Sequence, residues 1–120
     1  MIRASCHCGL ICLDIEVAPS EVTECNCSIC RRYGVLWAYY SPKQVRVKIQ
    51  STDATTDTYM WDDRSIVFHR CPTCGCVSHW TAVDATRDRM GINARLMPVE
   101  VLANARVRHL DGANTEQYLD

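Results

Sequence analysis

Alternation of apolar and polar residues predicts β-strands along much of the chain. Within residues 10–17, four apolar side chains alternate with Cys12, Asp14 and Glu16. A repeat of two residues is typical of a half-buried strand. Residues 45–49 alternate in the same way. We therefore expect two strands, each with one face in the core and one face toward solvent.

Further segments have the residues expected of strands, namely 35–40, 55–61, 65–71, 77–83 and 89–97. The polar residues 62–64 suit a hairpin turn between the second and third of these segments. Pro98 ends the last one, because proline cannot donate a ladder hydrogen bond. The expected total is seven or eight strands, which predicts a mainly β, mostly antiparallel fold.

The remaining segments are short or polar. Residues 19–32 form a polar stretch that is crowded with cysteines. Residues 99–105 suit a helical turn and residues 106–109 a last strand, although periodicity cannot decide over so few residues. Residues 111–114 predict a turn, because they combine Asp, Gly and Asn.

Composition narrows the class of protein. Hydrophobic residues make up 48% and charged residues 22% of the 120, so the chain can bury a core, and residues 1–120 are expected to form one domain. The net charge is −1 with Lys and Arg scattered, so no nucleic-acid partner is expected. The longest apolar run, residues 35–40, is far shorter than the ~18 residues of a membrane span. Without an apolar leader segment, we expect a cytoplasmic protein with no membrane partner.

The chain has nine cysteines, an odd number, and disulfides do not persist in a reducing cytosol. Bound metal explains them better. Seven of the nine lie in three clusters: Cys6-His7-Cys8-Gly9, Cys25-Asn26-Cys27-Ser28-Ile29-Cys30 and Cys71-Pro72-Thr73-Cys74-Gly75.

The cluster at Cys71 and Cys74 has the spacing of a metal knuckle. Two thiolates in such a turn face one ion at ~2.3 Å, and the following glycine lets backbone N–H groups point at sulfur. A thioredoxin-type redox pair would need a βαβ setting, whereas the flanking segments here are predicted strands. A rubredoxin-like iron site would need a second knuckle of this type. Zinc is therefore favoured over iron.

Counting the ligands separates two sites. Seven cysteines cannot complete two four-sulfur sites, so we expect one closed structural site and one three-sulfur site with the open position that catalytic zinc requires. The two-cysteine clusters together make the closed site, with the ligands Cys6, Cys8, Cys71 and Cys74. The open site then has the ligands Cys25, Cys27 and Cys30, the last two presented by a helical turn that begins at Ser28.

Other residues could complete the second site. Cys76 lies just beyond the knuckle, and as a fourth ligand it would turn the protein into a two-zinc structural module. His69 and His79 flank the knuckle at strand spacing and suit a proton carrier or a fourth ligand. The alternative for each histidine is a packed or exposed side chain.

The three clusters, CHCG, CxCxxCR and CPxCG, in that order and followed by Arg108-His109-Leu110-Asp111-Gly112-Ala113, resemble the glutathione-dependent formaldehyde-activating enzyme family, which includes relatives of centromere protein V. The resemblance implies a zinc-stapled antiparallel β-tent. It also implies a structural zinc on the four-sulfur set and a catalytic zinc on the three-sulfur set, the same assignment that counting gives. The activity implied is that of a carbon–sulfur lyase acting in reverse, in which the thiol of glutathione adds to formaldehyde.

Basic and aromatic residues are candidates for binding the substrates. Arg31 and Arg32 follow Cys30 directly and would offset an anionic metal site or hold a substrate carboxylate. Their alternative is to be solvated surface charges. Four aromatic residues of predicted strands either wall a small aldehyde pocket or belong to the core: Trp37, Tyr39, Tyr40 and Trp80.

The chemistry of the three-sulfur site favours a thiol substrate. Three thiolates give a zinc site a formal charge of roughly −1, which makes the ion a weaker Lewis acid than zinc on three histidines. We therefore expect a zinc-dependent enzyme that promotes the addition of a small thiol, glutathione or a similar one, to a small aldehyde such as formaldehyde. The alternative is a non-catalytic two-zinc structural or binding module.

Overall fold

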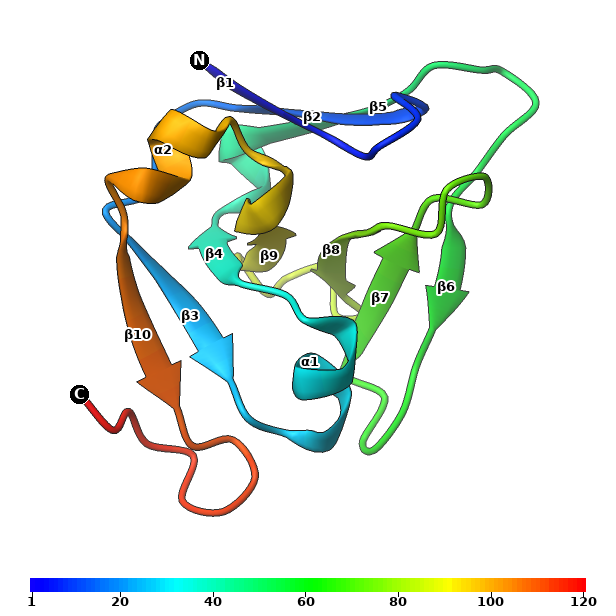
Figure 1. Ribbon diagram of the computed structural model, residues 1–120. Coiled ribbons are helices and arrows are strands. Elements are labelled where there is room, and N and C mark those ends of the chain that lie inside the picture. Colours follow the sequence, from blue (N-terminus) through cyan, green and yellow to red (C-terminus); the bar gives the residue numbers. More distant parts are fainter.

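The computed structural model describes residues 1–120 and contains two β-sheets (Figure 1). The smaller sheet is antiparallel and has the strand order β1-β2-β5, with β1 at Ile2–Ser5, β2 at Ile11–Ile15 and β5 at Val45–Ile49. It lies at the top of Figure 1, across one end of the larger sheet, with helix α2 (Val99–Ala103) just below it. The mainly β prediction is confirmed.

The larger sheet has seven strands in the order β10-β3-β4-β9-β8-β7-β6. Their bounds are β10 Arg106–Leu110, β3 Glu21–Cys25, β4 Trp37–Tyr40, β9 Met90–Asn93, β8 Val77–Ala82, β7 Ile66–Arg70 and β6 Asp57–Tyr59. All neighbours are antiparallel except β10 and β3, which are parallel. This parallel pair places Leu110 opposite Cys25, so the end of the chain lies beside the second cysteine cluster.

The strand count of seven or eight is too low, because the structure has ten. β1 and β3 are the strands that the pattern misses. The predicted strand at 89–97 ends at Asn93, whose side-chain oxygen accepts from the N–H groups of Leu36 and Arg95, at 3.4 and 3.2 Å. The bond from Arg95 caps a 3₁₀ turn at Ala94–Leu96. A second 3₁₀ turn, Pro42–Gln44, precedes β5.

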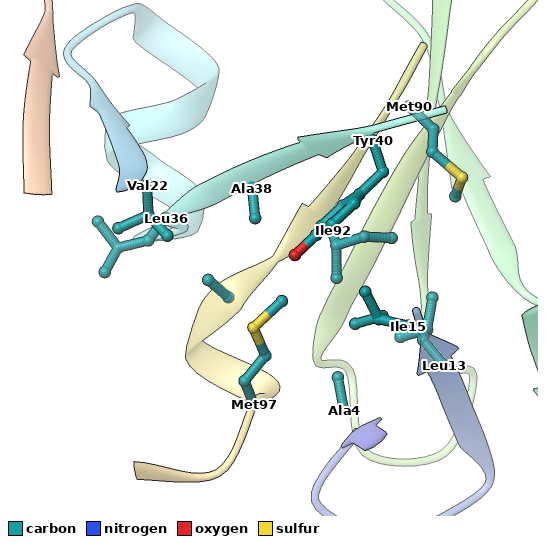
Figure 2. Packing of buried hydrophobic residues seen from close by; sticks show 11 residues of the cluster. Ala4, Leu13, Ile15, Val22, Leu36, Ala38, Tyr40, Met90, Ile92 and Met97 are labelled. Atoms are coloured by element: carbon teal, nitrogen blue, oxygen red, sulfur yellow. The ribbon is translucent and has the colours of Figure 1, made fainter. Parts of the chain in front are cut away.

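The main core lies between the two sheets (Figure 2). Leu13 and Ile15 of the small sheet pack toward Ala38, Tyr40 and Ile92 of the large one, and four of these five side chains are almost completely buried. Ala38 and Tyr40 take this side of β4 because successive residues of a strand face opposite ways. Tyr40 therefore belongs to the core, which is one of the two alternatives stated for the four aromatic residues.

Strand β2 is buried on both faces, unlike the half-buried strand that its pattern predicts. Asp14 is covered by Arg3, whose Nε donates to Oδ1 at 2.9 Å, and by Lys48, whose Nζ lies 2.7 Å from Oδ2. The hydrogen bond from Arg3, then that from Lys48, lower the pKa of Asp14 to about 2. A buried carboxylate is tolerated here because both of its oxygens have charged partners.

Candidate metal centres

Two turns that are distant in the sequence bring the first four cysteines together. Cys6 and Cys8 lie in the turn between β1 and β2, and Cys71 and Cys74 lie in the turn between β7 and β8. Their sulfur atoms all lie within 4.8 Å of one another, with 3.7 Å between Cys6 and Cys8 and 3.5 Å between Cys8 and Cys71. Sulfurs around a tetrahedral zinc with ~2.3 Å bonds are about 3.8 Å apart, so the donor set fits this ion.

Backbone N–H groups surround the sulfurs of this first group. Ile11 donates to Cys6 Sγ at 3.3 Å, and Thr73 and Cys74 donate to Cys71 Sγ at 3.4 Å each. Gly75 after the knuckle has φ +80°, a left-handed conformation that L side chains rarely adopt. Donors aimed at sulfur stabilise the thiolate form, which is the form that binds metal.

The second group is local and is built on the start of helix α1 (Ser28–Tyr33). Cys25 ends β3, Cys27 is the N-cap of α1, and Cys30 lies in the first turn of the helix. The Cys27 sulfur accepts from the N–H of Cys30 at 3.4 Å, and Gly34, at φ +67°, ends the helix. The helical turn predicted from Ser28 is confirmed. The three sulfurs lie within 4.8 Å of one another, with no fourth His, Cys, Asp or Glu in the group.

The sulfurs of the second group interact strongly. Trp37 donates its indole Nε1–H to Cys30 Sγ at 3.3 Å. A hydrogen bond from the Cys30 thiol is the largest cause that lowers the pKa of Cys25, to about 5, and the same contact raises the pKa of Cys30. The soft, closely spaced sulfurs suit a thiophilic metal ion such as zinc.

A pocket of about 210 Å³ opens beside the second group. Cys25 and Cys30 form part of its wall, so two of the three cysteines border space that a small molecule can enter. The aromatic part of the wall consists of Trp37, Tyr39, Phe68 and Trp80. Three of the four aromatic residues proposed from the sequence thus line the pocket, and Phe68 is an addition that its short apolar strand gave no reason to single out.

The C-terminal turn covers the other side of the second group. Asn26 Nδ2 donates to Asp111 Oδ1 at 2.9 Å, and the N–H of Ala113 donates to Asn26 Oδ1 at 3.0 Å. Gly112 lies so close to the cluster that a Cβ there would overlap the sulfur of Cys25. The sequence predicts this turn, but only the parallel pairing of β10 with β3 brings it to the cysteines.

Cys76 does not complete the second group. Its side chain packs with Cys6, Ile11 and Cys71, and its carbonyl accepts from the N–H of Cys71 at 2.9 Å. It therefore lies beside the four-sulfur group, which corrects the alternative in which it closes the three-sulfur one. Cys12, the other remaining cysteine, is buried and donates to the carbonyl of Gly9 at 3.5 Å.

His69 and His79 also lie outside both groups. Their rings stack with centroids 4.3 Å apart, and His69 is hydrogen-bonded to the hydroxyls of Thr56 and Thr81 at 2.7 and 2.8 Å. Ser78 Oγ lies 2.7 Å from Nδ1 of His79, and burial lowers the pKa of His79 to about 3. Both are packed histidines, the alternative stated for them above.

Arg31 and Arg32 are exposed on α1 and do not line the pocket. Arg32 Nη1 donates to the carbonyl of Ser28 at 2.9 Å. The charged residue of the pocket is Arg87 instead, from the turn between β8 and β9. Sequence reasoning could not single it out, because it stands in a polar stretch eleven residues after the nearest cysteine.

The fold and the two sulfur groups define a class of mainly β proteins built around paired thiolate sites. The chain belongs to the glutathione-dependent formaldehyde-activating enzyme family, whose model matches residues 1–108. Its structure is similar to the crystal structure of a Rhodobacter sphaeroides protein, with a TM-score of 0.69 and 23% identity over 88% of this chain and 98% of that one. A comparison with curated protein sequences found no significant match. No helix has the length and apolar character that crossing a membrane requires.

Proposed function

We propose that this protein holds two zinc ions and promotes the addition of a small thiol to a small aldehyde. The closed four-sulfur group, Cys6, Cys8, Cys71 and Cys74, is the structural site. The three-sulfur group, Cys25, Cys27 and Cys30, is the catalytic site. The observation that carries this division is the pocket, because it borders Cys25 and Cys30 and the group has no fourth ligand of its own.

The reaction joins the sulfur of the thiol to the aldehyde carbon. The carbon–sulfur bond forms, the C=O π bond opens, and the thiol proton ends on the former carbonyl oxygen. With glutathione and formaldehyde the product is S-hydroxymethylglutathione. The family assignment supports this pair as the first substrates to test. When bound at the three-sulfur group, zinc would supply acidification and positioning of an incoming thiol.

The residues of the pocket account for substrate binding. Trp37, Tyr39, Phe68 and Trp80 provide an apolar wall that holds a small aldehyde and excludes bulk water. Trp37 also fixes Cys30 through its N–H···S hydrogen bond. This contact orients the sulfur and stabilises its thiolate form. The Asn26–Asp111 hydrogen bond holds the segment that carries Cys25 and Cys27.

The experiment compares addition rates by NMR exchange spectroscopy, because thiohemiacetals form quickly without any enzyme. Zinc-loaded wild type, Cys27→Ser and a protein-free sample are measured with glutathione and formaldehyde. We expect wild type to exceed the other two. Cys12→Ser is the matched control, since Cys12 is a buried cysteine outside both groups, and it should keep the wild-type rate.

The competing function is a non-catalytic two-zinc binding module. Cys25 and Cys30 are each only 8% exposed, as expected for ligands of a structural ion. If wild type does not exceed Cys27→Ser for any of several thiols and aldehydes, the enzyme proposal fails and the binding module replaces it.

A further inference from the structure

One charged side chain lies at the pocket beside the three-sulfur group. Arg87 is the only charged residue type in the lining. Apart from the cysteines and the aromatic residues, the only other polar residue there is Ser65. Its guanidinium carbon is 5.4 Å from the ring centroid of Trp80. This separation is within the range of a cation–π contact.

Hydrogen bonds of the β8–β9 turn hold the backbone at Arg87 beside the pocket. The N–H of Arg87 donates to the carbonyl of Asp84 at 3.0 Å, and the carboxylate of Asp84 accepts from the N–H of Thr86 at 2.9 Å. Trp80 is fixed from the neighbouring strand, because its indole occupies the space that a side chain at Gly91 would need. The backbone at Arg87 and the ring of Trp80 are therefore placed before any ligand binds, while the arginine side chain is exposed and accessible to a ligand.

No protein carboxylate forms a close ion pair with this guanidinium. Its charge does reach Asp63, whose carboxyl pKa is lowered mainly by hydrogen bonds to Ser65 and in smaller part by Arg87. Arg87 forms no ion pair within 4.0 Å, and the pocket lining contains neither Asp nor Glu. A second arginine, Arg89, stacks on Tyr39 with its guanidinium carbon 4.1 Å from the ring centroid, and it too has no ion pair. Two arginines thus stack on rings of the aromatic wall, and neither is held in a close ion pair.

A guanidinium supported on an aromatic ring is suited to a planar oxyanion, because its N–H groups match the two oxygens of a carboxylate. We propose that Arg87 binds a carboxylate of the thiol substrate, so that the pocket selects carboxylate-bearing thiols over neutral ones. The inference rests on the proposed function for its premise that the substrate is a thiol. Arg31 and Arg32 are not alternatives, because neither lines the pocket.

The test uses two thiols of equal length, 3-mercaptopropionate and 3-mercapto-1-propanol, each with formaldehyde. Calorimetric titration of the zinc-loaded protein measures their dissociation constants, and exchange spectroscopy measures kcat and KM. We expect wild type to bind the acid at least about tenfold more tightly than the alcohol, the size of effect that a charge-assisted hydrogen bond produces. Arg87→Gln should reduce this preference to within about twofold by raising KM for the acid, with kcat and both constants for the alcohol retained.

Two further variants sharpen the result. Arg87→Lys keeps the charge but loses the fork of N–H groups, and it should retain an intermediate preference. Arg46→Gln removes an exposed arginine of β5 that is outside the pocket, and it should bind both thiols as wild type does.

The inference is overturned if wild type binds the two thiols equally, or if Arg87→Gln weakens both to the same extent. A loss of zinc or of folding in Arg87→Gln would also overturn it, because the residue would then be structural. The proposed function fails in a different way. In that case no thiol reacts faster than in Cys27→Ser, whereas the binding preference and its dependence on Arg87 are still measured by calorimetry.

Discussion

A few contacts with residues outside the cysteine cluster determine the geometry of the three-sulfur group. At Gly112, the absence of a side chain leaves space for the sulfur of Cys25, and the hydrogen bond between Asn26 and Asp111 keeps the two backbones at this close distance. At Cys30, the indole N–H of Trp37 fixes the direction of the sulfur. The group therefore depends on contacts that lie far from the cysteines in the sequence.

Gly112→Ala should damage the second metal site selectively. The added methyl group overlaps the Cys25 sulfur, and overpacking of this kind costs about 1–3 kcal/mol. We expect bound zinc to fall from about two ions to about one per chain, with the first group unaffected. Zinc analysis and a thermal melt measure both effects. Ala113→Ser, at the exposed next residue, is the control, and equal metal content in the two variants would contradict the close approach of Gly112.

His79 should stay neutral at pH values where an ordinary histidine titrates. Burial lowers its pKa to about 3, so the unfolded chain binds a proton there first, and folding becomes less favourable as the pH falls below the normal value of 6.5. NMR titration of the imidazole resonances from about pH 8 to 5.5 should leave His79 unchanged. His109, whose pKa is raised by its hydrogen bond to Asp120, should titrate in the same spectra. A midpoint for His79 near that of a free histidine would contradict its burial.

The two groups differ in the elements that they join. The first connects the β1–β2 turn to the β7–β8 turn, across 63 residues between Cys8 and Cys71. The second lies within β3 and the first turn of α1. Closing a long loop removes more entropy from the unfolded chain than closing a short one. Metal at the first group should therefore contribute much more to folding than metal at the second.

Substitutions in the two groups should separate these contributions. Cys74→Ser is expected to abolish the cooperative thermal transition or lower it severely, because a metal-linked domain loses the folding free energy supplied by its structural ion. Cys30→Ser should remain folded and lose about one zinc ion. Circular dichroism and zinc analysis report the two outcomes. If the two variants unfold to the same extent, both sites are structural.

Strands with several β-branched or aromatic residues, such as β5 and β4, could be predicted from their pattern. β3 could not, because Glu21–Cys25 has one aliphatic residue and lies among cysteines that suggest a loop. The parallel pairing of β10 with β3 could not be predicted from a local pattern either. It depends on the direction in which the chain leaves α2.

For the site, spacing and ligand counting predict which cysteines gather, because the coordination number of zinc is a small whole number. That these cysteines bind zinc stays a prediction. The position of Cys76 beside the first group could not be predicted, since a residue one step beyond a turn can point to either side of it. Arg87 was missed because only the folded β8–β9 turn carries it to the pocket.

The whole molecule combines a four-sulfur group, which joins a turn of the small sheet to a turn of the large one, with a three-sulfur group beside a pocket. The main core between the sheets is separate from both, so the fold has three apolar clusters, and the cysteine groups each lie in one of the smaller two. The pocket therefore borders cysteines of the second cluster without opening the main core. It also means that a single experiment on the two metal ions can test the division of roles.

The most direct test is cadmium-113 NMR of the protein loaded with this zinc substitute and titrated with 3-mercaptopropionate. The account predicts two resonances, of which only the one from the Cys25, Cys27 and Cys30 group moves when the thiol is added, while the one from the four-sulfur group stays in place. The second resonance is assigned by its absence in Cys27→Ser. One resonance, or two that both ignore the thiol, would contradict an open three-sulfur site beside a substrate pocket.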